Sequence, residues 1–170
     1  MNHIKPAILL SVGLQLLTSS TFAPAQDTRP NIVFIMVDDM GYGDLPAYGA
    51  TDVRTPNLDE FASQGVRLTD YYAAGAECTP TRTALMTGLY PQRIGGMECA
   101  IGTGNVGRYD DAIRLRELHD LGVPVTQSVL ATSLQKAGYS TAVFGKWHLG
   151  YERKHHPLNH GFEQFFGFLG

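Results

Sequence analysis

The sequence predicts an α/β fold built on a largely parallel sheet. Residues 31–37, Asn-Ile-Val-Phe-Ile-Met-Val, form a short continuous apolar run, which is typical of a strand buried on both faces. Further along the chain, segments with helical apolar stripes lead into new apolar runs, so that strands and helices alternate. This alternation indicates helices packed on a sheet of mostly parallel strands.

The first predicted helix begins after Thr55, a residue that often caps helices, with Pro56 in its first turn. Leu58 and Phe61 share one face, and Gly65 ends the helix. The apolar character of residues 66–73 then predicts a second strand.

The last predicted unit begins with Thr126 as a helix cap and ends its helix at Gly138. Residues 139–147 follow as another strand. Between these units, residues 102–124 are glycine-rich and then charged, so we expect a surface excursion with a short helix over 112–119. The apolar stretch 165–170 carries no closing signal, and we therefore expect the chain to stop within a domain.

Composition limits the function classes. The chain has 170 residues, a formal net charge of -3 and 44% hydrophobic residues, which suits one soluble domain or a piece of a larger one. Nucleic-acid binding needs clustered Lys and Arg, and the longest basic run, residues 153–156, reads as a solvated loop. We expect no nucleic-acid partner.

The N-terminus has the pattern of a signal peptide over residues 1–25. A short basic region precedes the apolar stretch 7–17, and Ala23-Pro-Ala25 is a small-residue cleavage site. A buried or anchoring helix is the alternative, but about 11 apolar residues fall short of the roughly 20 that span a bilayer. We expect a linker over 26–30, export to the periplasm or outside the cell, and no stable membrane anchor.

Cys78 and Cys99 are the two cysteines, and an exported protein could join them in a disulfide. Thr79 and Pro80 suit the cap and the first position of a helix, which places Cys78 at a helix N-terminus that favours anions. Arg82 lies one turn further and can reach the same spot. A thiol in such a place is reactive, whereas the alternative is a buried structural cysteine.

Asp38 and Asp39 directly follow the first predicted strand, where open α/β sheets bind their ligands. Adjacent carboxylates repel each other unless a cation or hydrogen bonds intervene, and their hard oxygens suit calcium or magnesium. The alternative is a turn with two exposed acids.

Lys146 and His148 point to the same side of an extended segment, with Trp147 between them on the other side. An ammonium and an imidazole on one side can hold an anion and move a proton. The alternative is a strand end whose polar residues face solvent.

Together these segments resemble the sulfatase family. Cys78-Thr-Pro-Thr-Arg82, continued by Met86-Thr-Gly88, is similar to its signature, with Thr81 in place of the usual serine. The loop 38–44 and the hexapeptide 145–150 are similar to two further family motifs, and the resemblance covers about residues 30–170. It implies an alkaline-phosphatase-like three-layer sandwich with a largely parallel central sheet, incomplete in this chain, in which residues 31–170 form the N-terminal part of a truncated catalytic domain.

The resemblance implies a sulfuric ester hydrolase that acts on an aryl sulfate or a sulfated glycan. A formylglycine-generating enzyme would oxidise the signature cysteine, and calcium, with magnesium as the alternative, would be the metal. The catalytic residues it implies are Cys78, Arg82, Lys146 and His148, and the metal ligands are Asp38, Asp39 and residue 78 itself.

The resemblance also implies limits and rivals. The family's remaining metal ligands lie beyond Gly170, so we expect residues 1–170 alone to be inactive and poorly folded. A phosphonate or phosphodiester hydrolase of the same superfamily and a non-functional truncated remnant are the alternatives. Asp44 is expected to shape its loop, and the histidines at 155, 156 and 160 are expected to be loop residues without a direct role.

Overall fold

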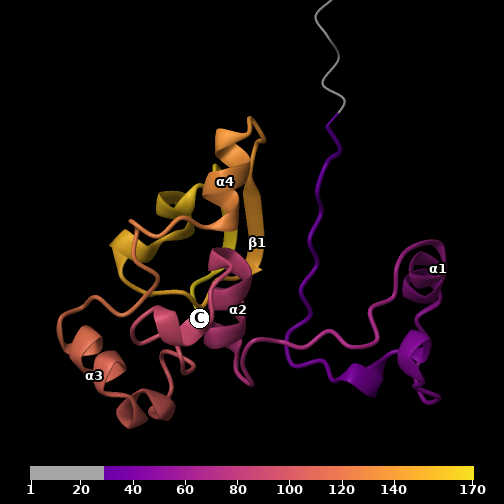
Figure 1. Cartoon of the computed structure of the whole chain (residues 1–170), viewed down its shortest axis with the longest axis horizontal. Helices are drawn as coiled ribbons and strands as arrows, with labels where there is room; N and C mark the ends of the chain where they lie inside the picture. Colours follow the sequence, from indigo (N-terminus) through magenta and orange to yellow (C-terminus); the bar gives the residue numbers. More distant parts are fainter. Residues whose placement is uncertain (1–28) are drawn as a thin grey trace, which may run out of the picture. The chain divides into compact units, whose positions relative to one another are not determined.

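The structure is a computed structural model that describes residues 29–170, apart from the side chain of Asn105. The expected signal peptide and most of the linker lie outside the described residues. The chain divides after Met36 into two units, and each is described by itself. Figure 1 traces the chain through its helices and strands.

In the first unit, the predicted buried strand is wrong. Residues 30–36 have no regular secondary structure, and Val33 and Ile35 are 83% and 78% exposed. An apolar run specifies a strand only where neighbouring strands satisfy its backbone hydrogen bonds. No strand of the described chain pairs with these residues.

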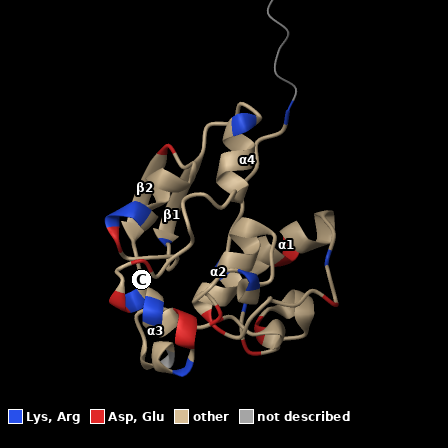
Figure 2. Cartoon of the chain, turned by 60° about the vertical axis from the view of Figure 1, so that its left-hand side comes forward, with Lys and Arg blue, Asp and Glu red and all other residues tan. Residues whose placement is uncertain are grey.

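The second unit, residues 37–170, holds the helices and strands, joined by short 3-10 turns. Its elements are α1 Pro56–Gln64, α2 Cys78–Thr87, α3 Asp110–Glu117, α4 Leu130–Lys136, β1 Ala142–Lys146 and β2 Gln164–Phe168. Acidic and basic residues are interspersed along it, for example on α3 (Figure 2). There, Arg114 Nη2 lies 3.1 Å from Asp111 Oδ1.

The two strands form a parallel pair in which Phe144 lies opposite Phe166. This agrees with the parallel pairing that the sequence predicts. The second predicted strand, residues 66–73, is wrong, because this segment has no regular secondary structure and Val66 is 87% exposed. No strand among residues 29–170 pairs with it either.

The predicted helices are confirmed, but three of them, α2, α3 and α4, begin at other residues than predicted. The first follows Thr55 as expected. The last begins at Leu130 and not near Thr126, because the Thr132 hydroxyl accepts the backbone N–H of Val129 at 2.9 Å and closes the first turn from inside the helix. The signature helix α2 begins one residue before Thr79, with Glu77 as its cap.

The expected surface excursion over 102–124 holds for most of its residues, which are exposed, but a few apolar side chains within it are buried. Val106, Ala112 and Val123 are at most 1% exposed, and they pack in one core with Trp147. Their spacing has no helical or strand period, so the pattern in the sequence does not reveal burial. Within this segment α3 supplies the short helix, beginning two residues earlier than predicted.

The histidines after β1 are not all solvent-facing loop residues. His155 and His160 lie in 3-10 turns and are 2% and 1% exposed. Trp147 donates its indole N–H to the His155 carbonyl at 2.9 Å, and its ring lies 5.6 Å from the His160 ring. These residues therefore fix the tryptophan between Lys146 and His148.

Candidate active site

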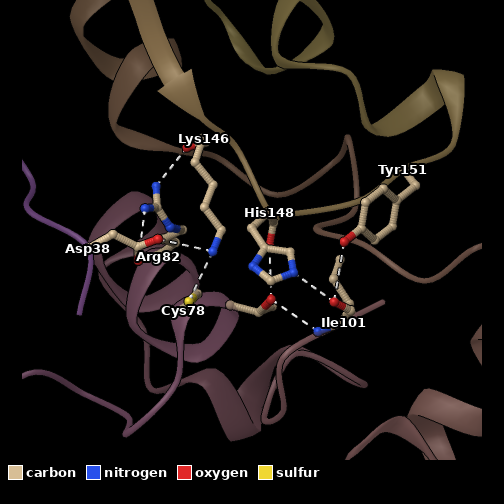
Figure 3. Close-up of polar contacts among 8 residues, drawn as sticks. Asp38, Cys78, Arg82, Ile101, Lys146, His148 and Tyr151 are labelled. Atoms are coloured by element: carbon tan, nitrogen blue, oxygen red, sulfur yellow. Dashed lines mark hydrogen bonds and ion pairs between the residues drawn. The ribbon is translucent and has the colours of Figure 1, made fainter. Parts of the chain in front are cut away.

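Three segments far apart in the sequence meet at the N-terminus of α2. The Lys146 ammonium, at the end of β1, lies 3.1 Å from Cys78 Sγ and 3.1 Å from Asp38 Oδ2 (Figure 3). The sequence predicts all three residues as site residues, and the structure brings them together.

Cys78 is the first residue of α2, where backbone N–H groups lack helical partners and the helix dipole is positive. The preceding Glu77 accepts the Ala100 N–H at 2.6 Å, which ties the helix start to the core. Nearby, a Cβ on Gly75 would lie 2.7 Å from the Pro80 ring, so only glycine allows the chain to approach so closely.

The cysteine is free, as is Cys99, so the structure does not pair them. Cys99 is fully buried in the core. Its burial raises the pKa of its thiol, and the nearby charges of Glu98 and Glu77 raise that pKa further.

Arg82 binds the site from the next turn of α2. Its Nη1 donates to the Lys146 carbonyl at 2.7 Å, and its Nη2 lies 3.4 Å from Asp38 Oδ1. The Arg82 side chain is 12% exposed and therefore largely shielded from water. It fixes the end of β1 against the helix that carries Cys78.

The charges of the site stabilise one another. The hydrogen bond from Lys146 holds the pKa of Asp38 below its ordinary value, against a smaller opposing effect of burial. Burial alone would lower the pKa of Lys146, but its hydrogen bonds to Cys78 and Asp38 outweigh burial and raise that pKa. At neutral pH the site therefore holds a carboxylate and two cations beside residue 78.

Asp38, Asp39 and Cys78 also form a possible metal site. One ligand atom from each lies within 4.8 Å of the others, and both carboxylates are exposed. Asp39 has φ +57, a left-handed conformation that Asp tolerates better than most residues. The two carboxylates suit a hard cation, whereas the thiolate does not, and an oxygen at position 78 would complete a hard ligand set.

His148 lies beside the start of α2. It is not part of a regular strand, although the sequence predicts an extended segment here. The strand ends at Lys146, and His148 has φ +56. Its Nε2 lies 2.6 Å from the Ile101 carbonyl, while no group of the described chain bonds its buried Nδ1. Burial lowers the pKa of the His148 imidazole, the Ile101 carbonyl opposes this, and the Lys146 and Arg82 charges add to it.

Asp44, which the sequence predicts to shape its loop, and two residues that it does not predict, Ile101 and Tyr151, complete the geometry. Asp44 accepts the Gly41 N–H at 2.6 Å and so closes its loop. Neither Ile101 nor Tyr151 was identified from the sequence. The Tyr151 hydroxyl donates to the Ile101 carbonyl at 3.3 Å. A backbone carbonyl is common to every residue and leaves no signal in the sequence.

A family model described as Sulfatase matches residues 30–170. The chain belongs to the sulfatase family. Human arylsulfatase H is 43% identical over 148 residues, which cover 84% of this chain and 25% of that protein. The chain thus spans about a quarter of the length of the curated sulfatases it matches.

Solved structures agree with this assignment. One, from work on glycosaminoglycan metabolism by Bacteroides thetaiotaomicron, superposes with a TM-score of 0.68 at 37% identity and covers 82% of this chain and 28% of its own. Ps i-CgsB in complex with k-i-k-neocarrahexaose has a TM-score of 0.63 at 35% identity, covering 78% of this chain and 26% of its own. The fold is therefore a partial sulfatase α/β fold. Among residues 29–170 no helix has the length and apolar character to cross a membrane.

Proposed function

We propose that the protein hydrolyses sulfate esters, with residue 78 as its nucleophile after oxidation of the cysteine to formylglycine. The convergence of Lys146 on both Cys78 and Asp38, at 3.1 Å each, supports this proposal most directly. A lone structural cysteine has no need of a half-buried cationic partner and a carboxylate beside it.

A formylglycine hydrate at position 78 would supply a hydroxyl nucleophile for sulfur, without water having to attack the ester. Around it, Lys146 and Arg82 would stabilise the negative charge that develops on the sulfate oxygens. His148 would move a proton through Nδ1, which no group among residues 29–170 bonds. The side chains to which we assign these roles lie near one another at the start of α2 (Figure 3), which supports the proposal.

The carboxylates of Asp38 and Asp39, with the oxygen of residue 78, would hold a divalent metal. We propose calcium, with magnesium as the alternative. When bound, it would polarise oxygen atoms at residue 78 and on the sulfate. Lys146 and Arg82 already occupy both oxygens of Asp38, so they would share this carboxylate with the metal.

The substrate class we propose is a sulfate ester, either an aryl sulfate or a sulfated glycan. The solved relative in complex with k-i-k-neocarrahexaose supports the glycan. The other partner is a formylglycine-generating enzyme, which would read the cysteine, proline and arginine of residues 78–82. The signal-like N-terminus supports a periplasmic or secreted location.

Residues 1–170 on their own should be inactive and poorly folded. Two carboxylates and one further oxygen are fewer than the six to eight oxygens that calcium takes. Large apolar side chains on the paired strands, such as Phe144 and Phe166, are 70% and 78% exposed. Clear turnover of an aryl sulfate by purified residues 1–170 would contradict this proposal.

The test of the function uses the longest protein that carries this sequence, co-produced with a formylglycine-generating enzyme. Rates are measured on matched aryl sulfate and aryl phosphonate esters, with Cys78→Ala as the control. We expect cysteine-dependent turnover that favours the sulfate. A strong preference for the phosphonate would instead assign the protein to phosphonate or phosphodiester hydrolysis.

A further inference from the structure

Three buried hydrogen bonds form a closed ring through Thr79, Ile101 and His148. The Thr79 hydroxyl donates to the His148 carbonyl at 3.0 Å, and its oxygen accepts the Ile101 N–H at 3.2 Å. The Ile101 carbonyl in turn lies 2.6 Å from His148 Nε2. Thr79 and Ile101 are 0% exposed and His148 is 5% exposed, so water does not compete for these bonds.

This ring determines which nitrogen of His148 carries the proton. A carbonyl oxygen can only accept, so Nε2 must be the N–H that donates to Ile101. A neutral imidazole has one N–H, which leaves the lone pair on Nδ1. No group in the described part of the chain bonds Nδ1. Nδ1 is therefore the nitrogen whose lone pair can accept a proton.

The same ring holds an uncommon backbone conformation. His148 has φ +56, which residues with a side chain seldom adopt. Its N–H donates to the Leu169 carbonyl at 2.8 Å, and its own carbonyl is held by the Thr79 hydroxyl. Without that hydroxyl, the His148 carbonyl and the Ile101 N–H would each lose a buried partner.

We infer that Thr79 is a positioning residue, which fixes the orientation and tautomer of His148 beside residue 78 through the Ile101 peptide. The inference rests on the proposed function for the role of His148. Thr79 directly follows Cys78 in the chain, so its two hydrogen bonds also fix the start of α2 against the base. Being fully buried, Thr79 acts through His148 and not through contact with substrate.

Three variants of the longest protein that carries this sequence test the inference. Thr79→Val removes the hydroxyl and keeps the shape, whereas Thr79→Ser keeps the hydroxyl. Thr83→Val is the matched control, because Thr83 lies one turn further along α2, is 0% exposed, and has a hydroxyl without a partner among residues 29–170. Rates are expressed per formylglycine, which mass spectrometry quantifies, since Thr79 lies within the segment that the modifying enzyme reads.

We expect Thr79→Val to lower kcat by about tenfold to a hundredfold, as substitution of an orienting partner does elsewhere, with KM changed by less than about twofold. Thr79→Ser should restore most of the rate, and Thr83→Val should match the wild type. Equal kcat values in Thr79→Val and Thr83→Val would overturn the inference.

A second readout does not depend on activity. In protein labelled with ¹⁵N-histidine, with His148→Gln used to assign its signals, neutral His148 should show a protonated Nε2 and an unprotonated Nδ1. In Thr79→Val the two nitrogens should shift toward a mixture of tautomers. A wild type protonated at Nδ1 would overturn the inference, whatever esters the enzyme hydrolyses. If no sulfate ester is turned over, the proposed function fails, and these nitrogen signals still decide the role of Thr79.

Discussion

His160 should make the protein sensitive to acid in a defined pH range. Its side chain is 1% exposed against Trp147, and neither ring nitrogen has a partner in the described chain. Burial, with a smaller effect of the His155 charge, lowers the pKa of His160 from 6.5 to about 4. The folded protein therefore keeps this imidazole neutral where the unfolded chain protonates it.

The size of the effect follows from this difference in pKa. Between pH 6.5 and about 4 the unfolded state binds one proton more, so the free energy of unfolding falls as the pH falls. At about 1.4 kcal/mol per pH unit, the whole range corresponds to about 3 kcal/mol. Between pH 7 and pH 4.5 we expect a loss of about 2 kcal/mol from this residue.

Urea unfolding at pH 7 and pH 4.5 measures this loss in the wild type and in His160→Phe. The phenylalanine keeps an aromatic ring beside Trp147 and Phe162 and cannot be protonated. The variant should lose about 2 kcal/mol less than the wild type over this range, because the contribution of His160 is absent. If both proteins lose the same free energy, another group causes the acid sensitivity and our account of His160 is wrong.

Further predictions concern the proposed chemistry. Cys78→Ala should lower kcat on an aryl sulfate by at least about a thousandfold, and residual turnover near the wild-type rate would exclude residue 78 as nucleophile. Lys146→Met should lower kcat by about a hundredfold to a thousandfold per formylglycine, since the cation nearest Cys78 is lost; a change in KM alone would assign it to binding. Arg82→Lys should lower the free energy of unfolding by about 1–3 kcal/mol in urea titrations, because lysine cannot bond both Asp38 and the Lys146 carbonyl. Removing metal with EDTA should abolish turnover and calcium should restore it, whereas full activity of the metal-free protein would refute the proposed metal site.

Local signals in the sequence predicted local structure well. Thr55 and Pro56 placed the start of α1, because a cap and a first-turn proline act within a few residues. Residues 31–37 and 66–73 were predicted as strands and are not, since a strand depends on partners elsewhere in the chain. The burial of Val106, Ala112 and Val123, within a segment that is otherwise largely exposed, was missed for a related reason, because these residues follow no period.

The candidate site divides in the same way. The family motifs placed Asp38, Cys78 and Lys146 in one site, and the structure brings them within hydrogen-bonding distance. The partners of His148 could not be predicted, because one is a backbone carbonyl and the other, Thr79, is at a position that the signature does not specify. Such contacts depend on how distant segments pack.

The central claim is that residue 78 becomes a formylglycine. Peptide mass spectrometry of the protein, isolated from cells that contain a formylglycine-generating enzyme, tests this most directly. We predict a peptide whose residue 78 has lost H₂S and gained one oxygen relative to cysteine. We predict the same conversion in the Thr79→Ser protein. An unmodified Cys78 thiol, or a peptide joined to Cys99 by a disulfide, would contradict the account.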